Sequence, residues 1–374
     1  MSREFPEPKK RPIDIEIPLI ALSQHGGVRV LVEFANFAAA AGYSVRISIP
    51  KGRIGKKYDF HPNVEIYEVD ISFKSKYLTY FAYLAALPFI LEGKSVIANF
   101  FATFFPVLLC KIFFKKSFLY FVQDIESKYN GPLGKILNAF CEMSYCSSKI
   151  VAANSYLARE IKTRGRSVLA QIDLGVSPSF LMQEACMEGK KFDLIVFPRH
   201  EPWKGLDRLI RILDLYRQRY GVISVLAVGQ NPDSMMRLEM MGFACERPVD
   251  ERALVQAFDR ARVTLFTSHR EGFGLPPLEG MARGLPAVVF ECGGPSAYMR
   301  DGSNGYVIDG DDESSAVDWI HRLLTDDALY RSASDNARMT AAHHTNQGAF
   351  RALLALVVEQ SDLVDRRQAP QIDR

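Results

Sequence analysis

The sequence lacks the features of secreted, disulfide-bonded and membrane-spanning proteins. Six cysteines are scattered over 374 residues without a C-x-x-C pair, which in a chain of this length predicts reduced thiols in the cytosol. Residues 1–12 are polar and charged, so we expect no secretory leader. The uncharged runs of the most apolar stretch, 77–91 and 95–110, are shorter than the roughly 20 residues that a spanning helix requires. We therefore expect a cytoplasmic protein, and peripheral contact with the cytoplasmic face of a membrane stays open.

The chain also has little net charge, +3 in total, which argues against a dedicated nucleic-acid-binding protein. The charge is unevenly placed along the chain. Residues 1–180 hold 23 Lys and Arg against 15 Asp and Glu, whereas residues 181–374 hold 23 against 28. Either the first half meets an anionic surface or ligand, or the unevenness has no function.

Aromatic residues stand beside lysines near the end of the apolar stretch. Phe113 and Phe114 are flanked by Lys111, Lys115 and Lys116, as in segments that lie at a membrane interface. An anionic membrane surface is therefore one candidate partner. The alternative is burial, and we expect the core to hold most of the aromatic residues of this stretch.

Strand-like and helix-like patterns alternate twice along the chain. The alternation predicts an α/β protein with two doubly wound, Rossmann-like domains, 1–180 and 181–345, joined near 175–191 where the composition changes. One long helix is expected over about 327–360. Residues 346–374 are expected to form a C-terminal helix that could pack back on the first domain, followed by a polar tail. Doubly wound sheets bind ligands beyond the carboxyl ends of their strands, so we expect function in a central cleft between the domains.

The strongest motif is EGFGLPPLE at residues 271–279, followed by GMARGLP. Its glycines let a ligand approach the backbone closely. Its two prolines suit the first turn of a helix, predicted over 277–283, whose unpaired amides and positive dipole end favour a diphosphate. We expect Glu279 in that first turn and Glu271 in the loop before it. Two carboxylates placed in this way can accept hydrogen bonds from the hydroxyls of a sugar and a ribose.

This segment resembles the E-x7-E signature of retaining GT-B glycosyltransferases of family four. In that family the first glutamate lies beside the transferred sugar and the second binds the ribose of the nucleotide. The resemblance implies these roles for Glu271 and Glu279, and it implies that the backbone amides of Phe273, Gly274 and Leu275 bind the donor. The other interpretation is an acidic turn that opens an ordinary helix.

A second motif, FPRHEPWKG at residues 197–205, follows the first predicted strand of the second domain. Arg199 and Lys204 lie five residues apart around a turn, so they can converge on one diphosphate and neutralise the departing nucleotide. The pattern is similar to the R-x4-K-G element of the same family, which implies the leaving-group role for both residues. The alternative is a pair of solvated cations at a helix start.

The first domain carries weaker signals. Gly26-Gly27, between a strand and a helix predicted over 28–41, resembles the glycine loop of GT-B first domains and so implies donor binding. It lacks the G-x-G-x-x-G pattern, and a nicotinamide cofactor is not expected. Gln123-Asp124 ends a predicted strand and resembles a subgroup of bacterial surface-glycan rhamnosyltransferases. This makes Asp124 an acceptor-side candidate, with a strand-end cap as the alternative.

Three further features complete the comparison with the family. Asn154-Ser155 resembles its strand-to-helix N-S step, for which an ordinary helix N-cap is the other interpretation. Gly280 stands where relatives usually have alanine. Asp309–Asp312 could form a D-x-D metal motif, but an acidic start to a helix over 313–325 explains it better. We therefore expect no catalytic metal and no cofactor. The resemblance is firm over about 190–310 and thin over 1–180.

The resemblance implies a GT-B fold and a hexosyltransferase. The 181–345 domain would hold a nucleotide diphosphate sugar, and a hexose or deoxyhexose would move with retention to a growing glycan or lipid-linked acceptor, in bacterial-type polysaccharide or surface-glycan synthesis. One alternative is a sugar-nucleotide epimerase or phosphorylase on the same fold. The other is a catalytically silent scaffold of a glycan-assembly complex, which loss of Glu271, Arg199 or Lys204 would support; all three are present.

Overall fold

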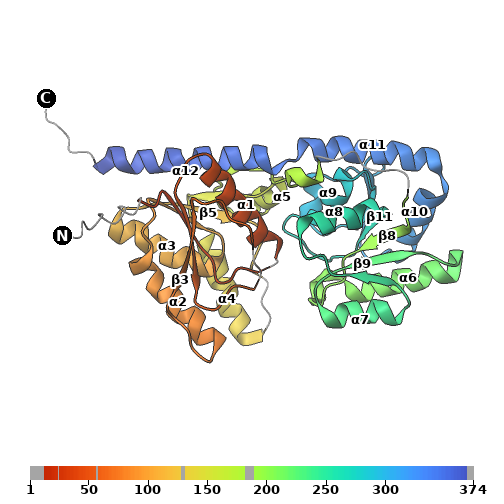
Figure 1. The fold of residues 1–374 in the computed structure, drawn as a ribbon, viewed down its shortest axis with the longest axis horizontal. Coiled ribbons are helices and arrows are strands. Elements are labelled where there is room, and N and C mark those ends of the chain that lie inside the picture. Colours follow the sequence, from red (N-terminus) through yellow and green to blue (C-terminus); the bar gives the residue numbers. More distant parts are fainter. Residues whose placement is uncertain (1–11, 24, 56–57, 128–130, 182–188, 369–374) are drawn as a thin grey trace, which may run out of the picture. The chain divides into compact units, whose positions relative to one another are not determined.

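The computed structural model describes residues 12–23, 25–55, 58–127, 131–181 and 189–368 (Figure 1). Two compact units divide the chain, and each is assembled from separate segments. The first unit consists of Met1–Ala152, Glu160–Ile172 and Phe350–Arg374, and the second consists of Ala153–Arg159 and Asp173–Ala349. Both units are α/β, with parallel strands only among the described residues.

The first unit is built on a seven-stranded sheet with the order β3-β2-β1-β4-β5-β6-β7. Its strands are β1 Ile15–Pro18, β2 Val45–Pro50, β3 Val64–Val69, β4 Ser95–Ala98, β5 Ser117–Val122, β6 Ile150–Ala152 and β7 Ala170–Gln171. The order reverses between β1 and β4, which makes the sheet doubly wound. Central strands such as β2 and β5 are buried along their whole length, because helices cover both faces of a parallel sheet. The helices are α1 Gly26–Ala40, α2 Lys76–Ile90, α3 Phe101–Phe114, α4 Gly131–Ser144, α5 Ser155–Thr163 and α12 Asn346–Gln368. The residues of α5 up to Arg159 and those of α12 up to Ala349 belong to the second unit.

The second unit is built on a six-stranded sheet with the order β10-β9-β8-β11-β12-β13. Its strands are β8 Phe192–Val196, β9 Val225–Val228, β10 Ala244–Glu246, β11 Ala261–Phe266, β12 Ala287–Phe290 and β13 Gly305–Ile308. The helices are α6 Leu206–Tyr220, α7 Pro232–Met240, α8 Glu251–Asp259, α9 Leu275–Ala282, α10 Glu313–Thr325 and α11 Asp327–His343. Short 3-10 turns lie at Pro178–Phe180, Pro202–Lys204 and Gly294–Ala297. The order reverses between β8 and β11, so the loops after these two strands lie side by side.

The prediction of one continuous helix over 327–360 is wrong, because α11 ends at His343 and a new helix, α12, begins at Asn346. The backbone of Val176 crosses the break: its N–H donates to the carbonyl of His344 at 2.9 Å, and its carbonyl accepts from Asn346 N–H at 3.0 Å. The side chain of Asn346 also accepts from Gly175 N–H at 3.0 Å. These bonds replace the helical bonds that a continuous helix would make at this point.

From Phe350 onward, α12 belongs to the first unit. The ring of Phe350 lies 5.8 Å from that of Phe34 on α1, in an edge contact. Further along, Lys149 donates to Gln360. Helix α4 has no counterpart among the predicted helices, since Gly131, Pro132 and Gly134 at its start are poor helix formers. Among the described helices, none combines the length and the apolarity that crossing a bilayer requires.

We predict that Gly175→Ala destabilises the fold by about 2 kcal/mol or more, as overpacking in a rigid site does. A Cβ at this position would lie 2.0 Å from the carbonyl oxygen of His344, which is backbone and cannot swing away. Gly348→Ala in α12 is the matched control, because its nearest neighbour would be the Thr345 hydroxyl at 3.7 Å. In denaturant titrations the control should equal or exceed the parent in stability. Equal stability of Gly175→Ala and the parent would contradict the prediction.

Candidate functional site

Glu271 lies in the loop between β11 and α9, and both its backbone and its side chain are held. Its N–H donates to the carbonyl of Cys292 at 2.6 Å, and its own carbonyl accepts from Gly294 N–H at 2.9 Å. Its carboxylate accepts from Lys204 Nζ at 2.9 Å and from Ser268 Oγ at 2.8 Å, both on Oε1. The loop therefore presents the carboxylate in one fixed position before any ligand arrives.

Lys204 reaches Glu271 from the neighbouring loop, between β8 and α6. The two side chains are 16% and 13% exposed, so the ion pair is largely screened from water. An ammonium group has three N–H donors, and Glu271 takes one of them. The remaining two can bind phosphate oxygens, so Lys204 can join the carboxylate to an anionic ligand.

The glycine after Lys204 makes this meeting of loops possible. Gly205 has a left-handed backbone with φ 70°. A Cβ on it would lie 1.9 Å from the carbonyl oxygen of Thr267, at the end of β11. The hydroxyl of Thr267 donates to the carbonyl of Gly205 at 3.0 Å. Only glycine satisfies both the conformation and the close approach, which explains the K-G pair of the motif.

Arg199 is half-buried, three residues beyond the end of β8. The part of the chain that the structure describes gives it no hydrogen bond or ion pair. Lys204 and Glu271 are thus brought together, whereas no contact yet joins Arg199 to either of them. The convergence of Arg199 and Lys204 on one diphosphate stays a prediction.

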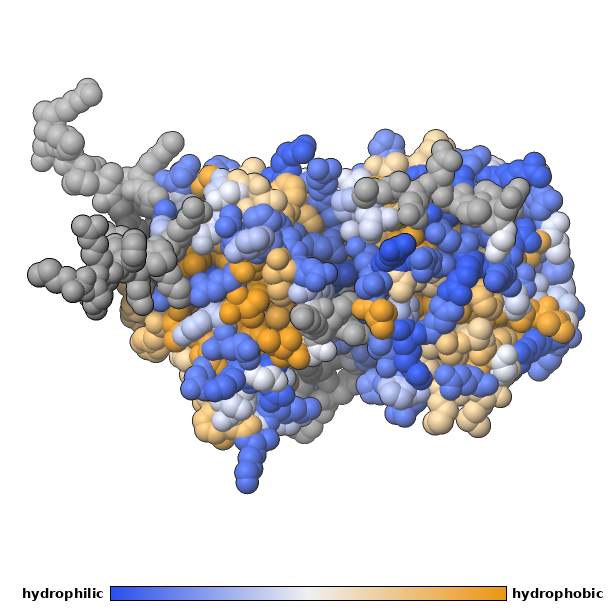
Figure 2. Space-filling view, in the orientation of Figure 1, coloured by the Kyte–Doolittle hydropathy of each residue, from blue (hydrophilic) through white to orange (hydrophobic). Residues whose placement is uncertain are grey.

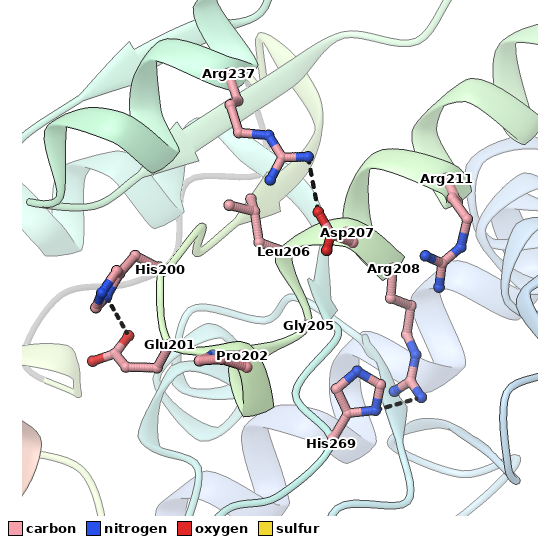
Figure 3. A pocket seen from close by; sticks show the side chains of 10 residues that line it. All are labelled: His200, Glu201, Pro202, Gly205, Leu206, Asp207, Arg208, Arg211, Arg237 and His269. Carbon is pink, nitrogen blue, oxygen red and sulfur yellow. Dashed lines mark hydrogen bonds and ion pairs between the residues drawn. The ribbon is translucent and has the colours of Figure 1, made fainter.

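A cavity of about 310 Å³ lies at the start of α6 (Figure 3). Buried Arg208 reaches Asp311 and donates toward His269 Nδ1 at 2.9 Å, and Arg237 donates to Asp207 at 2.8 Å. Burial and the nearby Arg208 charge lower the pKa of His269, which favours the neutral ring. Neither Arg199 nor Lys204 lines the cavity; its walls are His200, Glu201, Pro202, Gly205, Leu206, Asp207, Arg208, Arg211, Arg237 and His269. Its arginines pair with carboxylates, Arg208 with Asp311, Arg211 with Glu313 and Arg237 with Asp207.

Helix α9 begins earlier than predicted, at Leu275 instead of residue 277. Glu279 is therefore the fifth residue of the helix and not in its first turn, and its side chain is buried. The prolines at the second and third positions have no N–H, so the free first-turn amide is that of Leu275. Gly274 precedes the helix in a left-handed conformation with φ 80°. Among the described residues no hydrogen bond takes the amides of Phe273, Gly274 or Leu275, and their role in donor binding stays a prediction.

Two side chains that the sequence did not assign to the site hold this loop from behind. Buried Tyr298 donates its hydroxyl to the carbonyl of Gly274, and its ring lies 5.6 Å from that of Phe273. Fully buried Asn154 donates to the carbonyl of Gly272 at 2.6 Å, and its oxygen accepts from Leu157 N–H at 2.8 Å. Asn154 is therefore both a helix cap and a support of the Glu271 loop. The N-S pattern in the sequence could have pointed to Asn154, whereas no pattern in the sequence points to Tyr298.

Gly280 departs from the family pattern for a local reason. A Cβ at this position would lie 2.3 Å from Oγ1 of Thr264 on β11. The space that an alanine methyl would fill is occupied here by threonine.

In the first unit, α1 begins at Gly26 and not at residue 28, so Gly26 and Gly27 form the start of the helix. Gln123, directly after β5, donates to the carbonyl of Gly27 at 3.2 Å. The carboxylate of Asp124 accepts from Ile125 N–H at 2.8 Å, as in a local cap. The donor-binding role of the glycines and the acceptor-side role of Asp124 stay predictions.

Glu126 is a further acidic residue in the loop after β5, and the motifs read from the sequence did not include it. Its carboxylate accepts from Phe101 N–H at 2.8 Å, at the start of α3. Its own N–H donates to the hydroxyl of Tyr145 at 2.9 Å. Burial raises the pKa of Glu126 to about 8, and the nearby charge of Asp124 acts in the same direction.

The segment that carries Glu271 and Lys204 is similar to known glycosyltransferases. Residues 181–340 match the family profile described as "Glycosyl transferases group 1". Over 170 residues the chain is 28% identical to the D-inositol 3-phosphate glycosyltransferase of Xylanimonas cellulosilytica. This alignment covers 43% of this chain and 41% of that relative. The chain thus matches about two fifths of the length of this curated relative.

The similarity to solved structures extends over nearly the whole chain. Sucrose-phosphate synthase from Thermosynechococcus elongatus aligns with a TM-score of 0.78 and 14% identity, covering 93% of this chain and 98% of that one. Anabaena HepE, solved in complex with UDP-glucose, aligns with a TM-score of 0.69 and 13% identity, covering 93% and 99%. These alignments confirm the predicted fold of two Rossmann-like domains, and the profile confirms the predicted family resemblance over the second domain. Nearness to rhamnosyltransferases stays a prediction.

We predict that Glu126 makes the protein lose stability as the pH rises. Its pKa is about 8 in the folded chain and near 4.5 in its ordinary state. Folding therefore favours the protonated form, whose contribution is complete below about pH 4.5 and is lost as the pH rises through 8. Glu126→Gln keeps an oxygen for Phe101 N–H and should melt a few degrees above the parent at pH 9 but not at pH 4.5. Glu359→Gln, on the exposed side of α12, is the control; parallel melting curves for all three proteins would refute the assignment.

Proposed function

We propose, from the match of residues 181–340 to the profile of the group 1 glycosyl transferases, that the protein transfers a hexose or deoxyhexose from a nucleotide diphosphate sugar to a carbohydrate acceptor. The observation that carries this proposal is the ion pair between Lys204 and Glu271, at 2.9 Å. A fixed carboxylate suits the hydroxyls of the transferred sugar. An ammonium with two remaining donors suits the departing diphosphate. Transfer requires both groups at one place, the bond between the sugar and the diphosphate.

The reaction we propose retains the anomeric configuration. The bond between the anomeric carbon and the phosphate oxygen breaks, the acceptor oxygen bonds to the same carbon on the same face, and its proton passes to the leaving phosphate. Arg199 and Lys204 stabilise the charge that develops on the diphosphate, and no metal or cofactor enters the step. Glu279, further along α9, would bind the ribose.

The acceptor we propose is a growing glycan or a lipid-linked glycan, the latter reached by peripheral contact with a membrane. The basic balance of residues 1–180 supports an anionic partner for this part of the chain. The donor is open among the common nucleotide sugars. HepE was solved with UDP-glucose, so a UDP-sugar is the first to test.

Ligand binding and product analysis test the function directly. A donor that binds the folded protein should raise its melting temperature in a panel of UDP-, GDP- and dTDP-sugars. Transfer then requires an acceptor, whereas an epimerase would release free nucleotide and sugar without one. If no nucleotide sugar raises the melting temperature, the scaffold alternative is supported and the proposal fails.

We predict separate effects for the two glutamates. Glu279→Ala should weaken donor binding, because it removes the expected ribose partner. Glu271→Ala should lower kcat more than it changes affinity, since its carboxylate acts at the transferred sugar. Glu271→Gln keeps the shape of the side chain and tests whether the charge matters. Titration calorimetry with the donor and steady-state kinetics distinguish the effects; kinetics equal to the parent's for both alanine variants would remove the case for this site.

We predict that Arg199→Ala and Lys204→Ala each lower turnover by roughly 10²-fold or more, as loss of one preorganised charge-stabilising donor does. The control is Arg219→Ala, at the opposite end of α6, where the arginine pairs with Asp318. This control should keep the parent's rate, and EDTA should not change the rate of the parent. Strict dependence on Mn²⁺ or Mg²⁺ would show that a metal, and not these cations, neutralises the leaving group.

A further inference from the structure

Helices α2 and α3 of the first unit are apolar on nearly all sides. Their 15 and 14 residues include no Asp or Glu. A helix of this composition is ordinarily enclosed on every side. Here one side of each helix is buried, through Tyr83 and Leu87 on α2 and through Phe104 and Val107 on α3. On α2 the opposite side faces outward, and on α3 the exposed residues lie near its end, from Leu109 to Phe114 with Cys110 buried.

The outward sides carry large aromatic and aliphatic side chains. Phe81 and Phe89 on α2 are 72% and 80% exposed, and Phe113 on α3 is 69% exposed. The expectation that most aromatic residues of this stretch are buried is wrong for these positions. The other large exposed apolar residues of α2 and α3 are Tyr77, Leu78, Leu109, Ile112 and Phe114.

Helix α4 extends the same surface. Its Phe140 ring lies 5.6 Å from the ring of Phe105 on α3, in an edge contact. On the other side of α3, Cys110 Sγ lies 4.0 Å from the carbonyl of Leu87 on α2. Helix α4 exposes Leu133, Ile136, Phe140 and Met143. We call the exposed apolar residues of the three helices the α2–α4 face; Figure 2 shows hydrophobic side chains at the surface of this unit over α2 and α3.

Lysines border this face. Lys74 and Lys76 lie at the start of α2, Lys111 and Lys115 at the end of α3, and Lys135 on α4, and all five are exposed. Carboxylates are scarce there, since α4 contributes only Glu142, which pairs with Arg164.

Lys116 does not belong to the face, although the sequence suggested it. Its ammonium donates to the carbonyl of Leu91 in the interior of the unit. Burial lowers its pKa. The lysines that can meet an anionic partner are therefore the exposed ones.

We propose that the α2–α4 face docks on an anionic lipid bilayer. Aromatic side chains suit the boundary between headgroups and acyl chains, and the bordering lysines suit anionic headgroups. A second copy fits less well, because a symmetric dimer would set the same lysines against one another without carboxylates of α2 or α3 to balance them. Docking would bring a lipid-linked acceptor to the first unit; only this consequence rests on the proposed function.

Vesicle binding tests the docking face without any assay of transfer. The parent protein should sediment with vesicles of phosphatidylglycerol and phosphatidylcholine at low salt, and less with phosphatidylcholine alone. Lys111→Glu/Lys115→Glu should weaken this partitioning by about 30-fold or more, because each lysine near an anionic surface contributes roughly fivefold. Lys162→Glu/Arg166→Glu, at two exposed cations at the end of α5 and just beyond it, is the matched charge control and should bind more tightly than the face variant.

Phe81→Ser/Phe113→Ser tests the apolar contribution. It should reduce binding by at least about tenfold, since two exposed aromatic side chains would no longer enter the interface. Met240→Ser on α7 is the apolar control, because its side chain is 81% exposed on the second unit. Melting temperatures near the parent's show that the variants fold.

Three outcomes would overturn the proposal: a parent that ignores anionic vesicles at low salt, face variants that bind like their controls, or a parent dimer that Phe81→Ser/Phe113→Ser converts to a monomer without vesicle binding. The last outcome would assign the face to a second copy of the chain. If vesicles bind but no sugar is transferred, the docking face stands and the proposed function fails.

Discussion

Lys204 and Glu271 come from the loops that follow β8 and β11, two strands that lie beside each other at the centre of the second sheet. Taking two charges out of water is costly unless each has a partner. The pair meets this condition, and loss of either residue would leave the other charge largely buried without its partner. The position of this one contact depends on the order of the strands, and the chemistry we propose depends on the contact.

The loops around the pair are shaped by close approaches of backbone to backbone. A Cβ on Gly205 would overlap Thr267, and a Cβ on Gly294 would lie 2.4 Å from the backbone nitrogen of Phe273. Asn154 then fixes the carbonyl of Gly272 through a buried hydrogen bond. A site held in this way needs little rearrangement when charge develops on a leaving group, which is the condition for strong electrostatic stabilisation. Gly205 of the second motif and Gly294, beyond the first, are therefore structural requirements of a preorganised carboxylate and ammonium.

The first unit exposes large apolar side chains to solvent over the α2–α4 face. Its sheet is covered on both faces by helices, yet α2 and α3 are apolar beyond the sides that the sheet needs. Exposed aromatic side chains cost free energy in water, and an anionic bilayer is the solvent in which both they and their bordering lysines are favourably placed. Some of the lysines that make the first half of the sequence basic therefore lie together in the structure, at the border of the α2–α4 face.

Local chemistry in the sequence was enough for the two sheets, the two motifs and the alternation of strands and helices, apart from α4, whose start is rich in glycine and proline. Parallel strands buried on both faces are continuous apolar runs, and the glycines and prolines around Glu271 mark the turn into α9. Contacts between residues that are far apart in the sequence could not be predicted from local chemistry. The break between α11 and α12 depends on Val176, and the support of Gly272 depends on Asn154, so neither has a signal near its own position. The sequence also could not distinguish buried from exposed sides of α2 and α3, because an all-apolar helix has no periodicity to read; only the tertiary structure decided which aromatic side chains lie in the core and which face outward.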